Sequence, residues 1–215
     1  MILAFDTSAA HCAAALLFAG EIIAERTEAM TKGQAERLFP MLAEILADSG
    51  KTWSDISALG VGIGPGNFTG IRLSVAAARG LGLSLGCPAV GVSSLEAQVE
   101  ARPGRVLSLV DARRNQLYAQ HFTDHDPGEP GLFDQTDLPA AYRDKVDICI
   151  GAMADTIAPL IGARAERPTR GIAASIARIT STRLDENPNP PRPKPLYLKQ
   201  ADAAPSKTRP ALLLT

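Results

Sequence analysis

The sequence predicts an α/β protein whose two lobes are related by internal duplication. Apolar stretches of strand length alternate with longer segments whose apolar residues recur at helical spacing, a pattern typical of α/β domains. One layout also occurs twice: an apolar strand, an aspartate, a polar turn and a returning strand. It surrounds Asp6 in residues 2–18 and Asp111 in residues 106–122. The 215 residues suffice for two lobes with hydrophobic cores.

The first predicted lobe, residues 1–102, carries a glycine-rich turn and two long helices. Three consecutive strands with short turns predict a meander, and two later strands follow: residues 2–5, 13–19, 21–27, 58–63 and 88–92. The predicted helices are residues 35–48, residues 68–85 and a third that Ser93 or Ser94 caps and that runs to about residue 101. The first helix has one apolar stripe, formed by Leu38, Met41, Leu42, Ile45 and Leu46.

The second predicted lobe, residues 103–200, is smaller and more degenerate. Its predicted strands are residues 106–110, 116–122, 146–150 and 196–198. We expect a loop over residues 124–131, a helix over residues 172–183 and a proline-rich extended linker over residues 187–193. Residues 201–215 are expected to form a mobile tail.

The glycine-rich turn, residues 64–72, leads directly into the second helix. Its glycines permit backbone angles and close approaches that a β-carbon would prevent, and Asn67 or Thr69 can cap the helix. Free N–H groups at such a helix start attract phosphate, but a packing turn has the same composition. The spacing matches neither the P-loop nor the dinucleotide fingerprint, which favours the packing turn.

If the turn does bind phosphate, the aspartate-bearing hairpin would complete the site. Asp6 could position Mg²⁺ or a water molecule there, or it could simply bond its own turn. In the second lobe, Asp111 is followed by Ala112, Arg113 and Arg114 rather than by glycine, which hinders backbone approach to a phosphate. We therefore expect a vestigial phosphate site at most, formed by Asp6, Thr7, Ser8, Gly64, Gly66, Asn67, Thr69 and Gly70.

Composition argues against several functional classes. The net charge of −1 gives no basic field for direct nucleic-acid binding. The three cysteines, Cys12, Cys87 and Cys149, are widely spaced in apolar surroundings and predict buried, reduced thiols. The N-terminus lacks the features of a signal peptide, and no apolar run could span a bilayer. We expect a cytoplasmic protein.

The sequence offers no catalytic or metal-binding constellation. The three histidines, His11, His121 and His125, do not occur at a helical ligand spacing, so surface or strand-edge positions are favoured over a metal site. Nucleophile motifs and close carboxylate pairs are also missing. The helix over residues 68–85, by contrast, is apolar nearly all round. It is either sandwiched in the core or, together with the helix over residues 35–48, part of a subunit interface.

Six motifs, in order over essentially the whole chain, resemble the bacterial TsaB family of tRNA threonylcarbamoyladenosine biosynthesis proteins. They are Ile2-Leu3-Ala4-Phe5-Asp6-Thr7-Ser8, Arg37-Leu38-Phe39-Pro40, residues 64–72, Gly91-Val92-Ser93-Ser94-Leu95, Asp111-Ala112-Arg113-Arg114 and Pro195-Leu196-Tyr197-Leu198-Lys199. The resemblance implies the actin-like ATPase fold of sugar kinases and chaperones. In the related catalytic family TsaD, a His-x-x-x-His pair holds a metal, and the matching positions here are Ser94 and Gln98. Gln34 stands where many TsaB sequences have His.

The resemblance implies a non-catalytic partner subunit without metal or cofactor of its own. It would pair with TsaD, which binds the metal, and be joined by the ATPase TsaE. The complex forms threonylcarbamoyl at N6 of adenosine 37 in tRNAs that read ANN codons, and this chain would contact tRNA only indirectly. The family interface is half of a four-helix bundle, and without its partner the chain would form a homodimer. Here that interface points to Leu38, Met41, Leu42, Ile45, Ile71, Arg72, Val75 and Arg79.

Two other functional classes stay open at this point. An ATP-dependent kinase or hydrolase could work in a cleft between Asp6 and Asp111, although it would lack a second glycine-rich phosphate loop. A metalloprotease is disfavoured because the ligand pair is missing.

Overall fold

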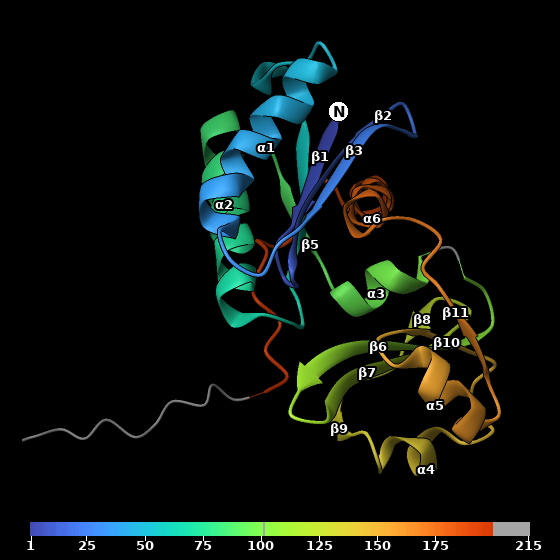
Figure 1. The fold of residues 1–215 in the computed structure, drawn as a ribbon. Coiled ribbons are helices and arrows are strands. Elements are labelled where there is room, and N and C mark those ends of the chain that lie inside the picture. Colours follow the sequence, from blue (N-terminus) through green and yellow to red (C-terminus); the bar gives the residue numbers. More distant parts are fainter. Residues whose placement is uncertain (101, 200–215) are drawn as a thin grey trace, which may run out of the picture.

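The protein folds into two lobes, each built on its own β-sheet (Figure 1). The computed structural model describes residues 1–100 and 102–199. The first sheet has the strand order β3-β2-β1-β4-β5, and the second has β11-β10-β6-β7-β8 with β9 paired to β7. Both sheets place an antiparallel hairpin beside parallel strands, β1–β2 next to β4 and β6–β7 next to β10. This shared arrangement supports the predicted duplication.

The first sheet agrees closely with the prediction. Its strands are β1 (Ile2–Asp6), β2 (His11–Phe18), β3 (Glu21–Ala29), β4 (Ala58–Gly62) and β5 (Ala89–Val92). Side chains alternate along β1, so Leu3 and Phe5 pack in one core cluster while Ile2 and Ala4 pack in another on the opposite face. Both faces are therefore buried, and each needs a helical layer.

Helices cover the two faces of this sheet (Figure 1). The helices α1 (Gln34–Asp48) and α2 (Phe68–Leu85) lie on one side, and α6 (Ile172–Glu186) lies on the other beside α3 (Ser94–Val99). A short 3₁₀ turn, η1 (Trp53–Asp55), precedes β4. Asn67 caps α2 as predicted, because its Oδ1 accepts hydrogen bonds from the N–H groups of Thr69 and Gly70. Ser93 caps α3 through a bond from Leu95 N.

The second lobe is richer in short elements than the sequence indicates. It contains β6 (Arg105–Arg113), β7 (Gln116–Thr123), β8 (Asp126–Pro127), β9 (Gly131–Asp134), α4 (Leu138–Tyr142), β10 (Ile148–Gly151), α5 (Ala154–Ile161) and β11 (Arg164–Glu166). The predicted loop over residues 124–131 is wrong in part, because it contains β8 and the first residue of β9. The predicted terminal strand over residues 196–198 is also wrong: the segment is irregular, and Leu196 N donates one bond to Ile63 O.

The helix α6 returns the chain to the first lobe. The sequence prediction placed this helix in the second lobe, residues 103–200, yet it packs on four strands of the first sheet: β1, β2, β4 and β5. Its buried residues Ile176 and Ala177 share a cluster with Ala4 and Val90. The division of the chain into domains at residue 102 stays a prediction, but this helix is a correction to the content of the second lobe. The predicted tail over residues 201–215 lies outside the described residues.

Two of the three cysteines are buried thiols, as expected. Cys12 and Cys149 are buried and free, and burial raises the pKa of Cys12 to about 11 and that of Cys149 to about 12. Cys87 is free and only half-buried, and burial raises its pKa as well. Within the described ranges, no helix combines the length and apolarity needed to cross a membrane.

Candidate functional site

The glycine-rich turn packs directly on the first hairpin, and the structure brings the predicted phosphate residues together there. A β-carbon on Gly70 would lie 1.8 Å from the backbone oxygen of Thr7, and one on Gly66 would lie 2.2 Å from that of Ser8. Two hydrogen bonds join the segments: Asn67 N to Ser8 O at 2.6 Å, and Thr7 Oγ1 to Gly70 O at 2.7 Å.

These contacts use the groups that a phosphate would need. The N–H groups of Thr69 and Gly70 donate to Asn67 Oδ1, and the N–H of Asn67 donates to Ser8. An anion-binding helix start requires such N–H groups to be free for the ligand. The structure thus supports the packing turn over the phosphate loop, while a vestigial phosphate site stays a prediction.

Asp6 lies at the centre of a buried polar cluster. It is 0% exposed, and its Oδ2 accepts hydrogen bonds from the backbone N and the Oγ of Ser8, at 3.1 and 2.9 Å. The same oxygen lies 2.6 Å from Nε2 of His11, whose side chain is 22% exposed. The Oγ of Ser94 contacts the Oγ of Ser8 at 3.1 Å. A β-carbon on Gly62 would overlap Asp6 Oδ1, so this glycine makes room for the carboxylate.

His11 is a functional candidate that the sequence reasoning assigned to the surface or to a strand edge. It does begin β2, as a strand-edge residue would, but it also pairs with Asp6 across the hairpin turn. The available signal was the position of both residues around one short turn, since the ends of a hairpin face each other.

A cleft and a smaller cavity lie between the lobes. The cleft has a volume of about 670 Å³ and is lined from both hairpins, with Ser8 and Asn67 on one side and Asp111, Arg113 and Lys199 on the other. The cavity, about 230 Å³, lies beside Asp6 and His11. Asp111 bonds its own turn, because its Oδ1 accepts from Arg113 N at 2.8 Å. The two aspartate-bearing hairpins therefore meet at the cleft as the duplication predicts.

The residues that match the metal-binding pair of TsaD have structural partners here. Ser94 contacts Ser8, and Gln98 Nε2 donates to Leu109 O at 3.3 Å. Gln34, at the start of α1, donates from Nε2 to Met30 O at 3.1 Å. Among the described residues, no three His, Cys, Asp or Glu side chains lie close enough together to hold a metal ion. The expectation that the chain needs no metal stays a prediction.

The eight predicted interface residues divide into two groups. Leu38, Met41, Leu42, Ile45, Ile71 and Val75 are buried in the chain's own core, so they cannot contact a partner directly. Arg72 and Arg79 are exposed. This corrects the prediction: the apolar stripe that marks α1 as amphipathic faces the first sheet, as a buried stripe does in a folded monomer.

The outward face of α1 and α2 is formed by other residues. The exposed residues of the two helices include small and large apolar ones, beside the charged Glu36, Arg72 and Arg79; the apolar and small ones are Ala35, Phe39, Pro40, Ala43, Phe68, Ala76, Gly80 and Leu83. Leu83 is 84% exposed and Phe39 is 45% exposed. We call this set the outer helical face. At the N-terminal end of α2, the Arg72 guanidinium stacks on the Phe68 ring at 3.8 Å, and Arg72 Nε donates to Tyr197 Oη at 2.8 Å.

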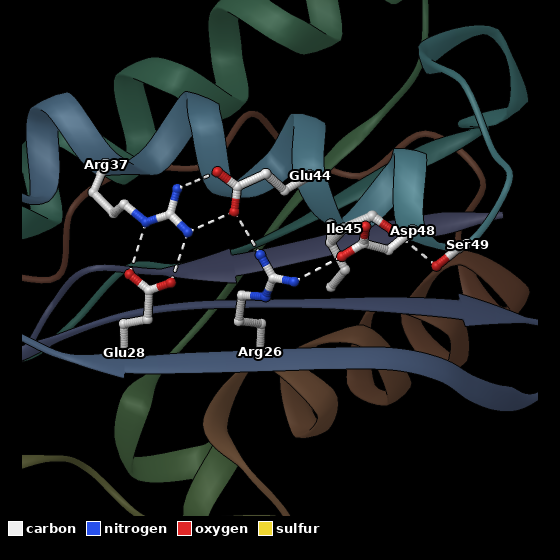
Figure 2. Close-up of polar contacts among 7 residues, drawn as sticks. All are labelled: Arg26, Glu28, Arg37, Glu44, Ile45, Asp48 and Ser49. Atoms are coloured by element: carbon white, nitrogen blue, oxygen red, sulfur yellow. Dashed lines mark hydrogen bonds and ion pairs between the residues drawn. The ribbon is translucent and has the colours of Figure 1, made fainter.

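An ion-pair network attaches α1 to the edge of the first sheet (Figure 2). Arg37 on α1 binds both carboxylate oxygens of Glu28 on β3, at 2.7 and 2.6 Å, and also binds Glu44. Arg26 on β3 extends the network to Glu44 and Asp48. Hydrogen bonds from Arg37 lower the pKa of Glu28 and of Glu44. The network orients the helix that carries half of the outer helical face.

The two lobes, with an antiparallel hairpin and parallel strands in each sheet, define an α/β protein of the actin-like ATPase fold. A solved structure of an uncharacterized protein with similarity to peptidase YEAZ, from Pseudomonas aeruginosa, superposes with a TM-score of 0.76 at 23% identity, covering 92% of this chain and 99% of that one. Component A of the (R)-2-hydroxyglutaryl-CoA dehydratase from Acidaminococcus fermentans gives a TM-score of 0.52 at 11% identity, covering 83% and 96% of the two chains.

Sequence comparisons then identify the relatives. The tRNA threonylcarbamoyladenosine biosynthesis protein TsaB of Escherichia coli (strain K12) is 33% identical over 150 residues, which are 67% of this chain and 63% of that protein. The TsaB of Haemophilus influenzae is 37% identical over 122 residues, 54% of this chain and 51% of that protein. Residues 21–127 match the family model described as TsaD, tRNA N6-adenosine threonylcarbamoyltransferase. These matches confirm the resemblance to the TsaB family, and they span about half to two thirds of each relative's length.

Proposed function

We propose that this chain takes part in threonylcarbamoyladenosine biosynthesis on tRNA as a non-catalytic subunit that binds and activates a TsaD-type transferase. The outer helical face is the observation that carries this proposal. Exposed Leu83 and Phe39 lie on the same two helices as the exposed Ala76 and Gly80, small residues that would let a partner helix approach closely and bury them. The names of the relatives supply the pathway.

The rest of the assembly follows from the same proposal. TsaE would join the pair and supply ATP hydrolysis, the TsaD-type subunit would hold the metal, and both would work in the cytoplasm. Without the transferase, two copies of this chain would associate through the outer helical face as a homodimer, since a self-complementary apolar face can pair with itself. The transferase would make most tRNA contacts, because the net charge of this chain is only −1.

Charge substitution on the outer helical face tests the proposal. Leu83→Asp and Phe39→Glu should abolish pull-down of a co-expressed TsaD-type subunit and shift the free chain to a monomer, because each buries a charge in the apolar contact. Both side chains are exposed, so the fold should persist by circular dichroism. Leu160→Asp, at an exposed leucine of α5 in the second lobe, is the matched control. Retained pull-down by both variants would refute the proposal.

Charges at Leu42 or Val75 would not test the interface. Both side chains are buried within the chain, so a charge there would unfold the monomer and remove binding for a different reason.

An ATP-dependent enzyme is the second candidate, and the cleft of about 670 Å³ with Arg113 and Lys199 on its wall favours it. Its size falls within the range of sites for drug-sized ligands. The glycine-turn amides that would hold the phosphates are already bonded to the first hairpin, which argues against it. Calorimetry with ATP and Mg²⁺ separates the two: micromolar binding with turnover by the isolated chain would favour the enzyme.

A further inference from the structure

The large cleft between the lobes has a positively charged wall. Three basic side chains and one acidic side chain line it: Arg113, Arg114, Lys199 and Asp111. Asp111 already accepts the N–H of Arg113 within its own turn. Within the described ranges, Arg113 forms no ion pair, and Lys199 Nζ donates to the neutral Gln116 Oε1 at 3.3 Å. The cleft therefore attracts anions, although the net charge of the whole chain is −1.

Two of these cations lie at the tip of the β6–β7 hairpin in an unfavourable backbone conformation. Arg113, Arg114 and Asn115 have φ values of 62°, 51° and 60°, all in the left-handed region. Asparagine adopts this region readily, but arginine does not, and glycine would adopt it without strain. Strained backbone of this kind is concentrated at functional sites. The turn holds two exposed arginines where glycine would suit the backbone better, which indicates a use for their charge.

A pair of aromatic side chains lies beside this positive wall. Phe68, which lines the cleft, and Tyr197 have ring centroids 5.2 Å apart, and they are 41% and 45% exposed. Arg72 holds both rings in place, through its stacking contact with Phe68 and its hydrogen bond to Tyr197. The segment that carries Tyr197 and Lys199 runs between the start of α2 and the β6–β7 hairpin (Figure 1). Aromatic and basic groups are therefore neighbours here.

This combination of groups is typical of a site for single-stranded nucleic acid. Such sites combine cations, which follow the phosphate backbone, with aromatic rings on which unpaired bases stack. A duplex keeps its bases stacked on one another and cannot use the rings. A free nucleotide fits less well, because the amides of the glycine-rich turn are already bonded within the chain. An acidic peptide would use the cations alone.

We propose that this chain binds an unpaired segment of RNA at a basic-aromatic surface, formed by Phe68, Tyr197, Arg113, Arg114 and Lys199. Bases stack on the two rings, and phosphates pair with the cations. The inference rests on the proposed function, whose pathway supplies the RNA, and deepens it. It assigns this chain a direct RNA contact in place of the indirect one that the family resemblance implies. Because Phe68 also belongs to the outer helical face, the surface is continuous with the proposed partner contact.

Fluorescence anisotropy with the purified full chain tests the ligand class. The probe is a fluorescein-labelled, non-self-complementary RNA of about 12 nucleotides, at low salt. The competitors are a duplex RNA of the same length, ATP, and polyglutamate of the same total charge. We expect saturable binding of the single strand and at least fivefold weaker competition by each of the three. Failure of the single strand to bind, or equal competition by any of them, would overturn the proposal.

Charge-removing variants test the location. Arg113→Gln and Lys199→Gln should each weaken RNA binding at least about threefold and lower the magnitude of the slope of log K against log[salt] by about 0.7. Arg143→Gln, at an exposed arginine that follows α4 and lies off the cleft wall, is the matched control and should change neither quantity. Equal effects of the three variants would reject the cleft as the site.

Two substitutions at Tyr197 test the stacking. Tyr197→Leu should weaken RNA binding about fivefold or more without changing the salt slope, because stacking involves no counterion release. Tyr197→Phe keeps the ring and loses only the hydroxyl group that Arg72 bonds, so it should bind RNA as the wild type does. An equal loss in both variants would mean that Tyr197 only positions Arg72, and it would overturn the stacking contact.

Failure of this inference is distinguishable from failure of the partner-subunit proposal. Arg113, Lys199 and Tyr197 lie outside the outer helical face, so their variants should retain pull-down of the TsaD-type subunit. Absence of RNA binding with retained pull-down overturns the RNA surface alone. RNA binding by a wild-type chain that pulls down no TsaD-type subunit supports the RNA surface and overturns the partner-subunit proposal.

Discussion

At the scale of single residues, the glycines of the turn serve close packing between two backbones. Gly66 and Gly70 let α2 approach the Thr7–Ser8 backbone, and Gly62 makes room for the Asp6 carboxylate. The sequence correctly grouped Asp6 with this turn, because glycines beside a strand-ending aspartate indicate a close approach. It did not indicate that Arg170, more than 150 residues further along the chain, lines the cavity beside Asp6.

Alanine substitutions at two glycines of α2 distinguish the effect of close packing on stability from the effect of helix propensity. Gly70→Ala places a β-carbon against Thr7 O and should lower the free energy of unfolding by about 1–3 kcal/mol. Gly80→Ala meets nothing within 4 Å and should raise it by about 0.5–1 kcal/mol through better helix propensity. Urea unfolding of both variants measures the difference. Equal effects would mean that the turn does not pack closely on the hairpin.

At the scale of elements, capping signals at both ends helped to locate one helix, and their absence helped to hide another. The helix over residues 68–85 was predicted with its observed bounds, since Asn67 caps its start and Gly86, with a φ of +65°, ends it. The helix α5 was missed because no side chain caps its start, which follows Met153 at a φ of +59°, and because Pro159 lies inside it. The short strands β8, β9 and β11 have two to four residues each, too few for a periodic pattern.

The interface prediction failed in part for a related reason. An apolar helical stripe indicates which residues become buried but not whether the chain itself or a partner covers them. Here the sheet covers Leu38 and Leu42, and the outer helical face is made of the small residues that the stripe leaves aside, with Phe39 among them. Only the packing of α1 on the sheet distinguishes the two faces.

The link between α1 and β3 should make stability depend on pH. Arg37 holds the pKa of Glu28 and Glu44 below their usual value of 4.5, so between the lowered values and about 4.5 the unfolded chain binds more protons. The stabilisation is therefore present above pH 4.5 and is lost as the pH falls through the lowered folded values. The three side chains are partly exposed, so solvent screening should keep the effect small.

Arg37→Gln is the variant that tests this dependence. Its melting temperature should lie below that of the wild type at pH 7, and the gap should narrow as the pH falls from 4.5 through the lowered pKa values of the two carboxylates. Arg79→Gln, an exposed arginine on α2, is the control and should show no such dependence. A gap that is constant from pH 3 to pH 7 would contradict the network.

At the scale of the whole molecule, α6 closes the fold by covering a face of the sheet formed by the first 92 residues of the chain. The duplication was readable from local patterns, but this return was not, because a helix stripe does not say which sheet it will cover. Arg183 on α6 fixes the return: it donates to Gly91 O at 2.6 Å and to both oxygens of Glu96 at 2.7 and 2.8 Å. In the sequence, the second lobe lies between the last strand of the first lobe and α6. The first lobe is therefore complete only when α6 has packed on its sheet.

Gly60 and Thr180 give the sharpest test of this closure, since they lie 120 residues apart in the sequence. A β-carbon on Gly60 would lie 2.5 Å from Thr180 Oγ1 and 3.0 Å from Ile176 Cγ2, so Gly60→Ala should destabilise the chain by about 1–3 kcal/mol. Among the described residues, Thr180 Oγ1 is buried without a hydrogen-bond partner, so Thr180→Ala removes no bond and should cost little. It also vacates the space that the new methyl group needs. The double variant should therefore be more stable than Gly60→Ala alone, with an interaction energy of at least about 0.5 kcal/mol in a double-mutant cycle measured by urea unfolding. Strict additivity would mean that α6 does not pack against β4, and the first lobe would then lack the helical layer on which its second core depends.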